Sequence, residues 1–103
     1  MNTAEKIELP PRDGDGYLLD MNDWTEEIGL AMAEADGFDM DEEKWAQVLK
    51  AREYYETYAS VPPIRKFAKY IGVDKKDLFK QWMTGPMKPI TKYGGLPKPT
   101  GCV

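Results

Sequence analysis

Residues 41–60 read DEEKWAQVLKAREYYETYAS, and this stretch decides the fold that the sequence predicts. Trp45, Val48 and Tyr55 recur at helical spacing on one side of a long segment. Asp41 stands where a side chain caps the first turn of a helix. We therefore predict one long amphipathic helix at the centre of a mainly helical core.

Shorter helices are predicted on both sides of this one. Capping residues, glycines and prolines mark their ends, and apolar residues recur between them with a period of three to four. The predicted helices run from Asn22 or Asp23 to Gly37, from Pro63 to Gly72, from the cap Asp74 to Met83, and from Met87 to Tyr93.

Two short β-favouring runs precede the helices. They cover residues 6–9 and 17–19, and the segment Asp13-Gly14-Asp15-Gly16 between them is typical of a turn. The predicted fold class is therefore α+β, predominantly α: a small N-terminal β-hairpin or meander packed on an array of about five helices. We predict one domain over residues 1–93.

The last ten residues, 94–103, are predicted to form a flexible C-terminal arm. Two neighbouring glycines and two prolines that lack N–H donors disfavour regular structure there. Ten extended residues span about 30 Å, at roughly 3.3 Å each. The arm would thus carry Cys102 well away from the domain.

The cysteine and histidine counts exclude several kinds of chemistry. The 103 residues contain one cysteine and no histidine, so an intramolecular disulfide, a zinc site and Cys/His catalysis are excluded. No cofactor site and no metal site are predicted. No long apolar run or leader is present, which predicts a protein without a membrane segment, and a free thiol suits the cytoplasm.

Charge is distributed unevenly along the chain. All 18 acidic side chains lie in residues 1–77, whereas the only charged side chains from Leu78 onward are Lys80, Lys88, Lys92 and Lys98. A basic C-terminal stretch on an acidic body indicates an anionic partner, or four solvated lysines.

Residues 63–83 allow a different function. Two short helices joined by Gly72-Val73-Asp74 have the spacing of a helix-turn-helix, with Lys75 and Lys76 available to DNA. Two packed helices with a short turn are also common in helical domains. The net charge of −4 weighs against binding to phosphate, so direct nucleic-acid binding is not expected.

Cys102 is the candidate catalytic residue. A thiolate near a chain end can attack a donor persulfide and then present the outer sulfur to an acceptor. Lys98 is a candidate for electrostatic support, and Thr100 and Gly101 are candidates as small or polar neighbours during docking. From position alone, sulfur chemistry and an incidental exposed thiol both remain open.

The ending GLPKPTGCV, residues 95–103, resembles the C-terminus of the DsrC/TusE family of sulfur-relay proteins. The similarity continues in order at DGYL (15–18), NDW (22–24), EKW (43–45), REYY (52–55), PPIR (62–65) and GP (85–86). It implies a small β-meander on helices and a sulfurtransferase that acts as a persulfide carrier through Cys102.

The resemblance also implies sulfur-donor and sulfur-acceptor proteins as partners. TusE-like proteins serve a tRNA thiolase, and DsrC proteins work with dissimilatory sulfite reductase. DsrC proteins active with that reductase have a second arm cysteine, and Thr91 occupies its place here. This favours relay toward tRNA 2-thiouridine synthesis or a single-cysteine carrier. The alternatives are an accessory, gamma-type partner of the reductase and a DNA-binding regulator.

Overall fold

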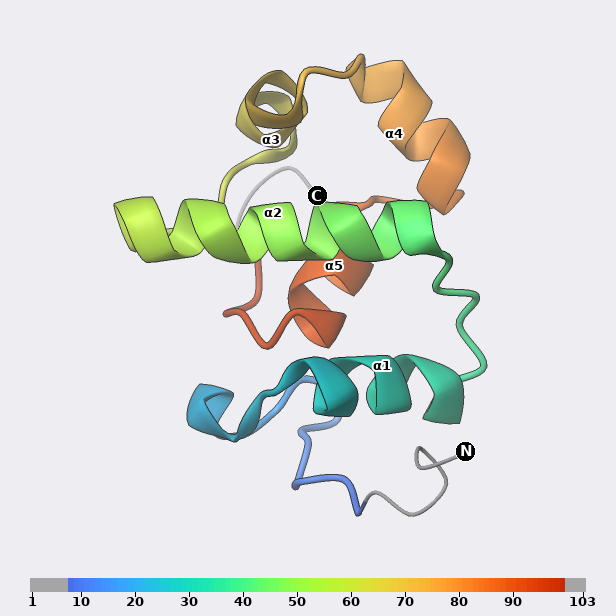
Figure 1. Cartoon of the computed structure of the whole chain (residues 1–103), viewed down its shortest axis with the longest axis vertical. Coiled ribbons are helices and arrows are strands. Elements are labelled where there is room, and N and C mark those ends of the chain that lie inside the picture. The colour runs from blue at the N-terminus through green and yellow to red at the C-terminus, as the bar shows by residue number, and fades with distance from the viewer. Residues whose placement is uncertain (1–7, 100–103) are drawn as a thin grey trace.

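The computed structural model describes residues 8–99 as a stack of helices (Figure 1). The longest helix, α2, crosses the middle of the molecule. The pair α3 and α4 lies on one side of α2, α5 lies on the other side, and α1 lies beyond α5. The elements are the 3-10 helix η2 (Met21–Asp23), α1 (Glu26–Ala35), α2 (Glu42–Tyr58), α3 (Ile64–Ile71), α4 (Lys75–Trp82) and α5 (Met87–Tyr93).

Local capping explains where the central helices begin and end. The Asp41 carboxylate accepts the backbone N–H of Lys44 at 2.8 Å, and the Asp74 carboxylate accepts that of Lys76 at 2.9 Å. Helix α3 ends at Gly72 in the left-handed region, with φ of 77°. These helices and their caps are confirmed, because each depends on residues within one turn of the helix end.

The first long helix begins later than predicted. The predicted start at Asn22 or Asp23 is wrong, since Asp20 caps only the short helix η2 and Trp24 returns to extended backbone. The hydroxyl of Thr25 then accepts the N–H of Ile28 at 3.1 Å and starts α1. Two successive caps therefore divide the segment.

The prediction of an N-terminal β-hairpin is also wrong, as far as residues 8–99 show. The only β-type pairing there is an isolated antiparallel bridge between Arg12 and Leu18, closed by the turn at residues 13–16. Pro10 and Pro11 provide no N–H for a ladder. Tyr17 and Leu18 instead bury their side chains. The rest of the first predicted strand, residues 6 and 7, lies outside the described residues.

Two apolar clusters hold the stack together. The larger one joins α2, α3, α4 and α5, and it also takes in Leu96, which follows α5. The smaller one joins the N-terminal segment, α1 and α5. Their buried members are Val48, Ala51, Ile64, Phe67, Ala68, Leu78, Trp82, Met87, Ile90 and Leu96 in the larger cluster, and Leu18, Met32, Ala33 and Tyr93 in the smaller one.

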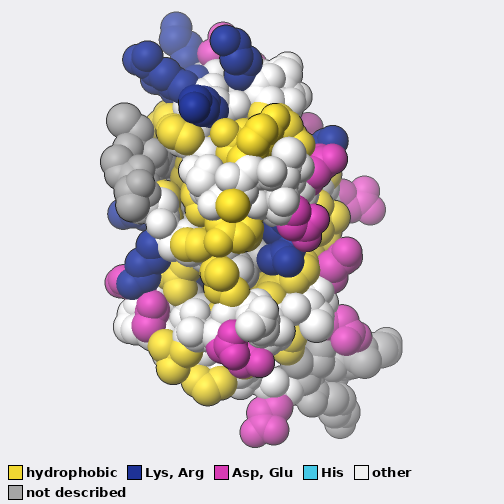
Figure 2. Space-filling model, turned by 90° about the vertical axis from the view of Figure 1, so that its left-hand side faces the viewer, with side chains coloured by type: hydrophobic (Ala, Val, Ile, Leu, Met, Phe, Trp, Pro, Cys, Tyr) yellow, Lys and Arg dark blue, Asp and Glu magenta, His cyan; other side chains and the backbone are white. Residues whose placement is uncertain are grey.

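Charge changes sign along the chain and across the molecule. Residues 8–63 hold four basic and fifteen acidic side chains, whereas residues 64–99 hold nine basic and two acidic ones. Figure 2 shows basic side chains gathered at one end of the long axis, where Figure 1 places α3 and α4.

Within the described residues, no helix is both long and apolar enough to span a membrane.

Candidate functional site

Of the four site residues that the sequence predicts, the structure places one. Lys98 is described, whereas Thr100, Gly101 and Cys102 lie outside the described residues. The candidate site is therefore the base of the C-terminal segment, where that segment meets the helical body.

The Lys98 ammonium group lies between two carboxylates of the turn at residues 13–16. Its Nζ is 2.8 Å from Asp15 Oδ2 and 3.2 Å from Asp13 Oδ2. It also lies 5.6 Å from the centre of the Tyr17 ring. The hydrogen bonds to Asp15 and Asp13 raise the pKa of Lys98. Its positive charge is thus already paired with two negative ones.

The turn that holds Lys98 is itself fixed by backbone hydrogen bonds. The second oxygen of Asp13, Oδ1, accepts the N–H of Asp15 at 2.8 Å and the N–H of Tyr17 at 3.0 Å. Asp13 therefore serves the turn with one oxygen and Lys98 with the other. This is the arrangement of an Asx turn, which the sequence Asp-Gly-Asp-Gly favours.

Tyr17 connects the same turn to α5. Its hydroxyl lies 2.9 Å from Thr91 Oγ1 and 3.1 Å from the carbonyl of Lys88. Thr91 is fully buried, and its hydroxyl also reaches the Met87 carbonyl at 2.7 Å. Burial raises the pKa of Tyr17, so its hydroxyl stays protonated at neutral pH.

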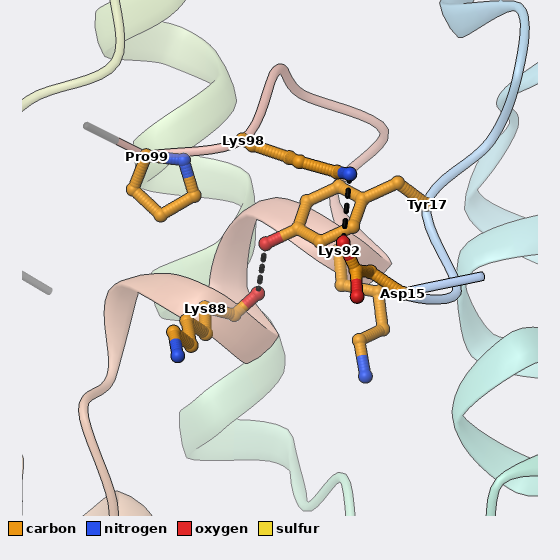
Figure 3. Close-up of a pocket in the computed structure, with 6 residues that line it drawn as sticks. All are labelled: Asp15, Tyr17, Lys88, Lys92, Lys98 and Pro99. Atoms are coloured by element: carbon orange, nitrogen blue, oxygen red, sulfur yellow. Dashed lines mark hydrogen bonds and ion pairs between the residues drawn. The ribbon is translucent and has the colours of Figure 1, made fainter. Parts of the chain in front are cut away.

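A pocket of about 290 Å³ opens at this place (Figure 3). In the close-up, the Lys98 chain passes over the Tyr17 ring toward Asp15, while the Tyr17 hydroxyl points to the Lys88 backbone. Three of the six lining side chains are cationic, and one is anionic. The lining residues are Asp15, Tyr17, Lys88, Lys92, Lys98 and Pro99.

The start of the predicted arm packs against the body. Arg52 donates to the Gly94 carbonyl at 2.5 Å, and its guanidinium stacks 3.8 Å from the Trp24 ring centre. The N–H of Leu96 donates to the Thr91 carbonyl at 3.0 Å, and the Leu96 side chain is buried. The packed body therefore extends at least to Leu96.

Sequence reasoning missed the residues that fix this base. Asp13 and Asp15 appeared only as turn residues, and Arg52 only within the REYY motif at residues 52–55. Their opposite charges to Lys98 were visible, but nothing local indicates a contact between residues 83 positions apart. Among the described residues, no group of three or more acidic, cysteine or histidine side chains is placed to hold a metal ion.

The fold and site define a small helical protein whose C-terminal segment is ion-paired to the helical body through Lys98. The chain belongs to the DsrC family, because the family model described as "DsrC like protein" matches residues 4–103.

Relatives with names and structures agree with that assignment. Sulfurtransferase TusE of Pectobacterium atrosepticum is 35% identical over 98 residues, which cover 88% of this chain and 90% of that protein. The solution structure of Allochromatium vinosum DsrC is 37% identical with a TM-score of 0.77, covering 89% of this chain and 88% of the other. The oxidized gamma-subunit of dissimilatory sulfite reductase (DsrC) from Archaeoglobus fulgidus is 32% identical with a TM-score of 0.74, covering 91% and 92%.

Proposed function

We propose that this chain is a sulfur carrier of a sulfur-relay system, a sulfurtransferase that accepts and passes on sulfur as a persulfide on Cys102. The observation that carries the proposal is the family match, which runs through the whole C-terminal segment and includes the only cysteine of the chain. The TusE sulfurtransferases aligned over nine-tenths of their length support the same activity.

The chemistry requires only a thiolate and two partners. The Cys102 thiolate attacks the outer sulfur of a donor persulfide, so a new S–S bond forms while the donor S–S bond breaks and the donor leaves as a thiol. An acceptor nucleophile then attacks the outer sulfur on Cys102, which leaves as a thiolate. No external oxidant or reductant enters the transfer.

The partners are a sulfur-donor protein and a sulfur-acceptor protein. As the finer assignment we propose an acceptor in tRNA 2-thiouridine synthesis, which is what the resemblance to TusE-like proteins implies; relatives named Sulfurtransferase TusE are consistent with it. We place the carrier in the cytoplasm, because its thiol has to stay reduced between cycles.

A second candidate is a gamma-type partner of dissimilatory sulfite reductase, which the Archaeoglobus fulgidus relative favours by name and fold. The place of the second cysteine of such proteins is taken here by Thr91, by the resemblance of the two sequences. Thr91 is fully buried and hydrogen-bonded in α5. A hydroxyl cannot form a disulfide, so a role in this chain would have to use Cys102 alone.

Intact-mass spectrometry tests the carrier proposal. After incubation with a cysteine desulfurase and cysteine, we expect the mass to rise by one sulfur atom and to return to its first value with reductant. Cys102→Ser is the matched control and should gain nothing. An unchanged mass, from a protein whose thiol alkylates freely, would refute the carrier function.

A further inference from the structure

The contact between Lys98 and the turn at residues 13–16 has no part in the persulfide chemistry described above. It joins two segments that are far apart in the sequence, since Lys98 and Asp15 are separated by 83 positions. We call these three residues the Asp13/Asp15/Lys98 clamp. Both carboxylates meet the same ammonium group, so neutralising one still leaves the other in place.

The clamp is anchored to the body on its acidic side. Asp13 is held by two backbone N–H groups, and Tyr17 connects the turn to Thr91 and Lys88 of α5. Figure 3 shows the Lys98 chain lying along the Tyr17 ring, with its ammonium group beside Asp15. The turn therefore holds the Asp13 carboxylate in place beside Asp15, and the lysine is the part that can leave.

We propose that Asp13 and Asp15 are positioning residues for sulfur transfer, which hold Lys98 and so set the place where the cysteine-bearing end leaves the body. The proposal deepens the carrier function and rests on it. With the clamp closed, Cys102 follows Pro99 by three residues and stays within about 10 Å of it. With the clamp open, the next anchor is the buried Leu96, six residues before Cys102, and the reach doubles to about 20 Å.

The charges argue for this role over direct activation of the thiol. An ammonium group already shared by two carboxylates adds little positive potential elsewhere. The side chains of Lys98 and Asp15 are half or more exposed, and exposed ion pairs are weak. The clamp thus biases the segment toward one position and still lets a docking partner release it.

The clamp is tested with a nitroxide label on Cys102, the only cysteine of the chain. Paramagnetic broadening of backbone NMR signals should concentrate on residues 15–17 and the first turn of α5 in the otherwise unchanged protein. In Lys98→Gln and in the double variant Asp13→Asn/Asp15→Asn, the broadening at these residues should fall by about two- to fivefold. This is the change in population that the loss of an exposed ion pair produces. Asparagine keeps the oxygen that caps the turn.

Two controls separate the clamp from a general change of charge or fold. Lys98→Arg should restore the broadening, because arginine can still pair with both carboxylates. Lys88→Gln removes a cation from the same pocket that forms no ion pair among the described residues, and it should change nothing. Equal broadening in Lys98→Gln and in the unchanged protein would overturn the proposal.

A transfer measurement gives the functional consequence. Loading of Cys102 from a small persulfide, such as glutathione persulfide, should keep its rate in Lys98→Gln, while half-saturation by a cysteine desulfurase should rise about two- to fivefold. The pH profile of thiol alkylation should be unchanged. A higher thiol pKa in Lys98→Gln, with none in the double aspartate variant, would overturn the positioning role and assign Lys98 to the thiolate. If no persulfide forms at all, the carrier function fails, whereas the label experiment still reports on the clamp.

Discussion

At the scale of single residues, Gly95 shows how closely the C-terminal segment fits the body. Its φ is +65°, and a Cβ added there would lie 2.5–2.6 Å from atoms of Trp24. The Trp24 ring cannot retreat, because the Arg52 guanidinium covers it and its indole N–H donates to the Tyr93 carbonyl at 2.8 Å. Only a residue without a side chain fits here.

We therefore predict that Gly95→Ala lowers the free energy of unfolding by about 2–5 kcal/mol, the sum of a left-handed backbone and an overpacked ring. Chemical denaturation measures it. Gly72→Ala is the matched control, since Gly72 has φ of +77° but open space around it. The control should lose only the backbone contribution, about 1–2 kcal/mol. Equal losses in the two variants would show that the contact with Trp24 is not tight.

At the scale of elements, one ion-paired network joins the N-terminal segment, the end of α1 and the end of α5. Arg12 donates to both oxygens of Asp36 at 3.1 Å, and the Tyr93 hydroxyl donates to the same carboxylate at 2.8 Å. Burial alone would raise the pKa of Asp36, but the hydrogen bonds from Arg12 and Tyr93 outweigh it and lower that pKa.

The lowered pKa predicts how stability depends on pH. The ionised Asp36 stabilises the fold above its unfolded pKa of about 3.9, and this contribution is lost as the pH falls through its lower folded pKa. Asp36→Asn should thus cost about 1 kcal/mol at pH 7, and the difference should shrink below about pH 4. Asp23→Asn, an exposed aspartate with no ion pair among the described residues, should show no such trend in urea unfolding at pH 3–7. A constant difference for Asp36→Asn would contradict the assignment.

At the scale of the whole molecule, the charges form a strong asymmetry. The described part before α3 has a net charge of −11, and the part from α3 to Pro99 has a net charge of +7. The cations of α3 and α4 are exposed and form no ion pair among the described residues; they are Arg65, Lys66, Lys69, Lys75, Lys76 and Lys80. We therefore expect the basic end of the molecule to face the acidic surface of a binding partner.

Sulfur transfer between proteins should therefore depend on salt. We predict that loading from a cysteine desulfurase slows with added NaCl, whereas loading from glutathione persulfide changes little. Neutralising the basic end with Lys66→Gln/Lys69→Gln should slow the protein reaction by about tenfold at low salt. Glu26→Gln/Glu27→Gln neutralises the acidic part to the same extent and should not slow it. A rate that is independent of salt would exclude electrostatic steering.

The sequence by itself determined the features that depend on near neighbours. The long helix α2, its cap Asp41, the α3–α4 pair with Asp74 and Gly72, and the short helix α5 all follow from residues within one turn of each other. The resemblance of the C-terminal residues also led to the family that the comparison confirms. Capping hydrogen bonds and the period of apolar positions depend only on residues that are close together in the sequence, so they can be predicted from it.

Only the tertiary structure decided the contacts between distant residues. The runs around Leu9 and Leu18 have the composition of strands, yet within residues 8–99 Tyr17 and Leu18 are buried against the helices and a single bridge takes the place of a β-ladder. In the same way, the sequence did not show that Lys98 lies between Asp13 and Asp15, and its expected support of a thiolate stays a prediction. The physical reason is that an ion pair depends on the distance between its charges. The sequence gives the charges, whereas the packing of the helices decides which carboxylates lie close to a given cation.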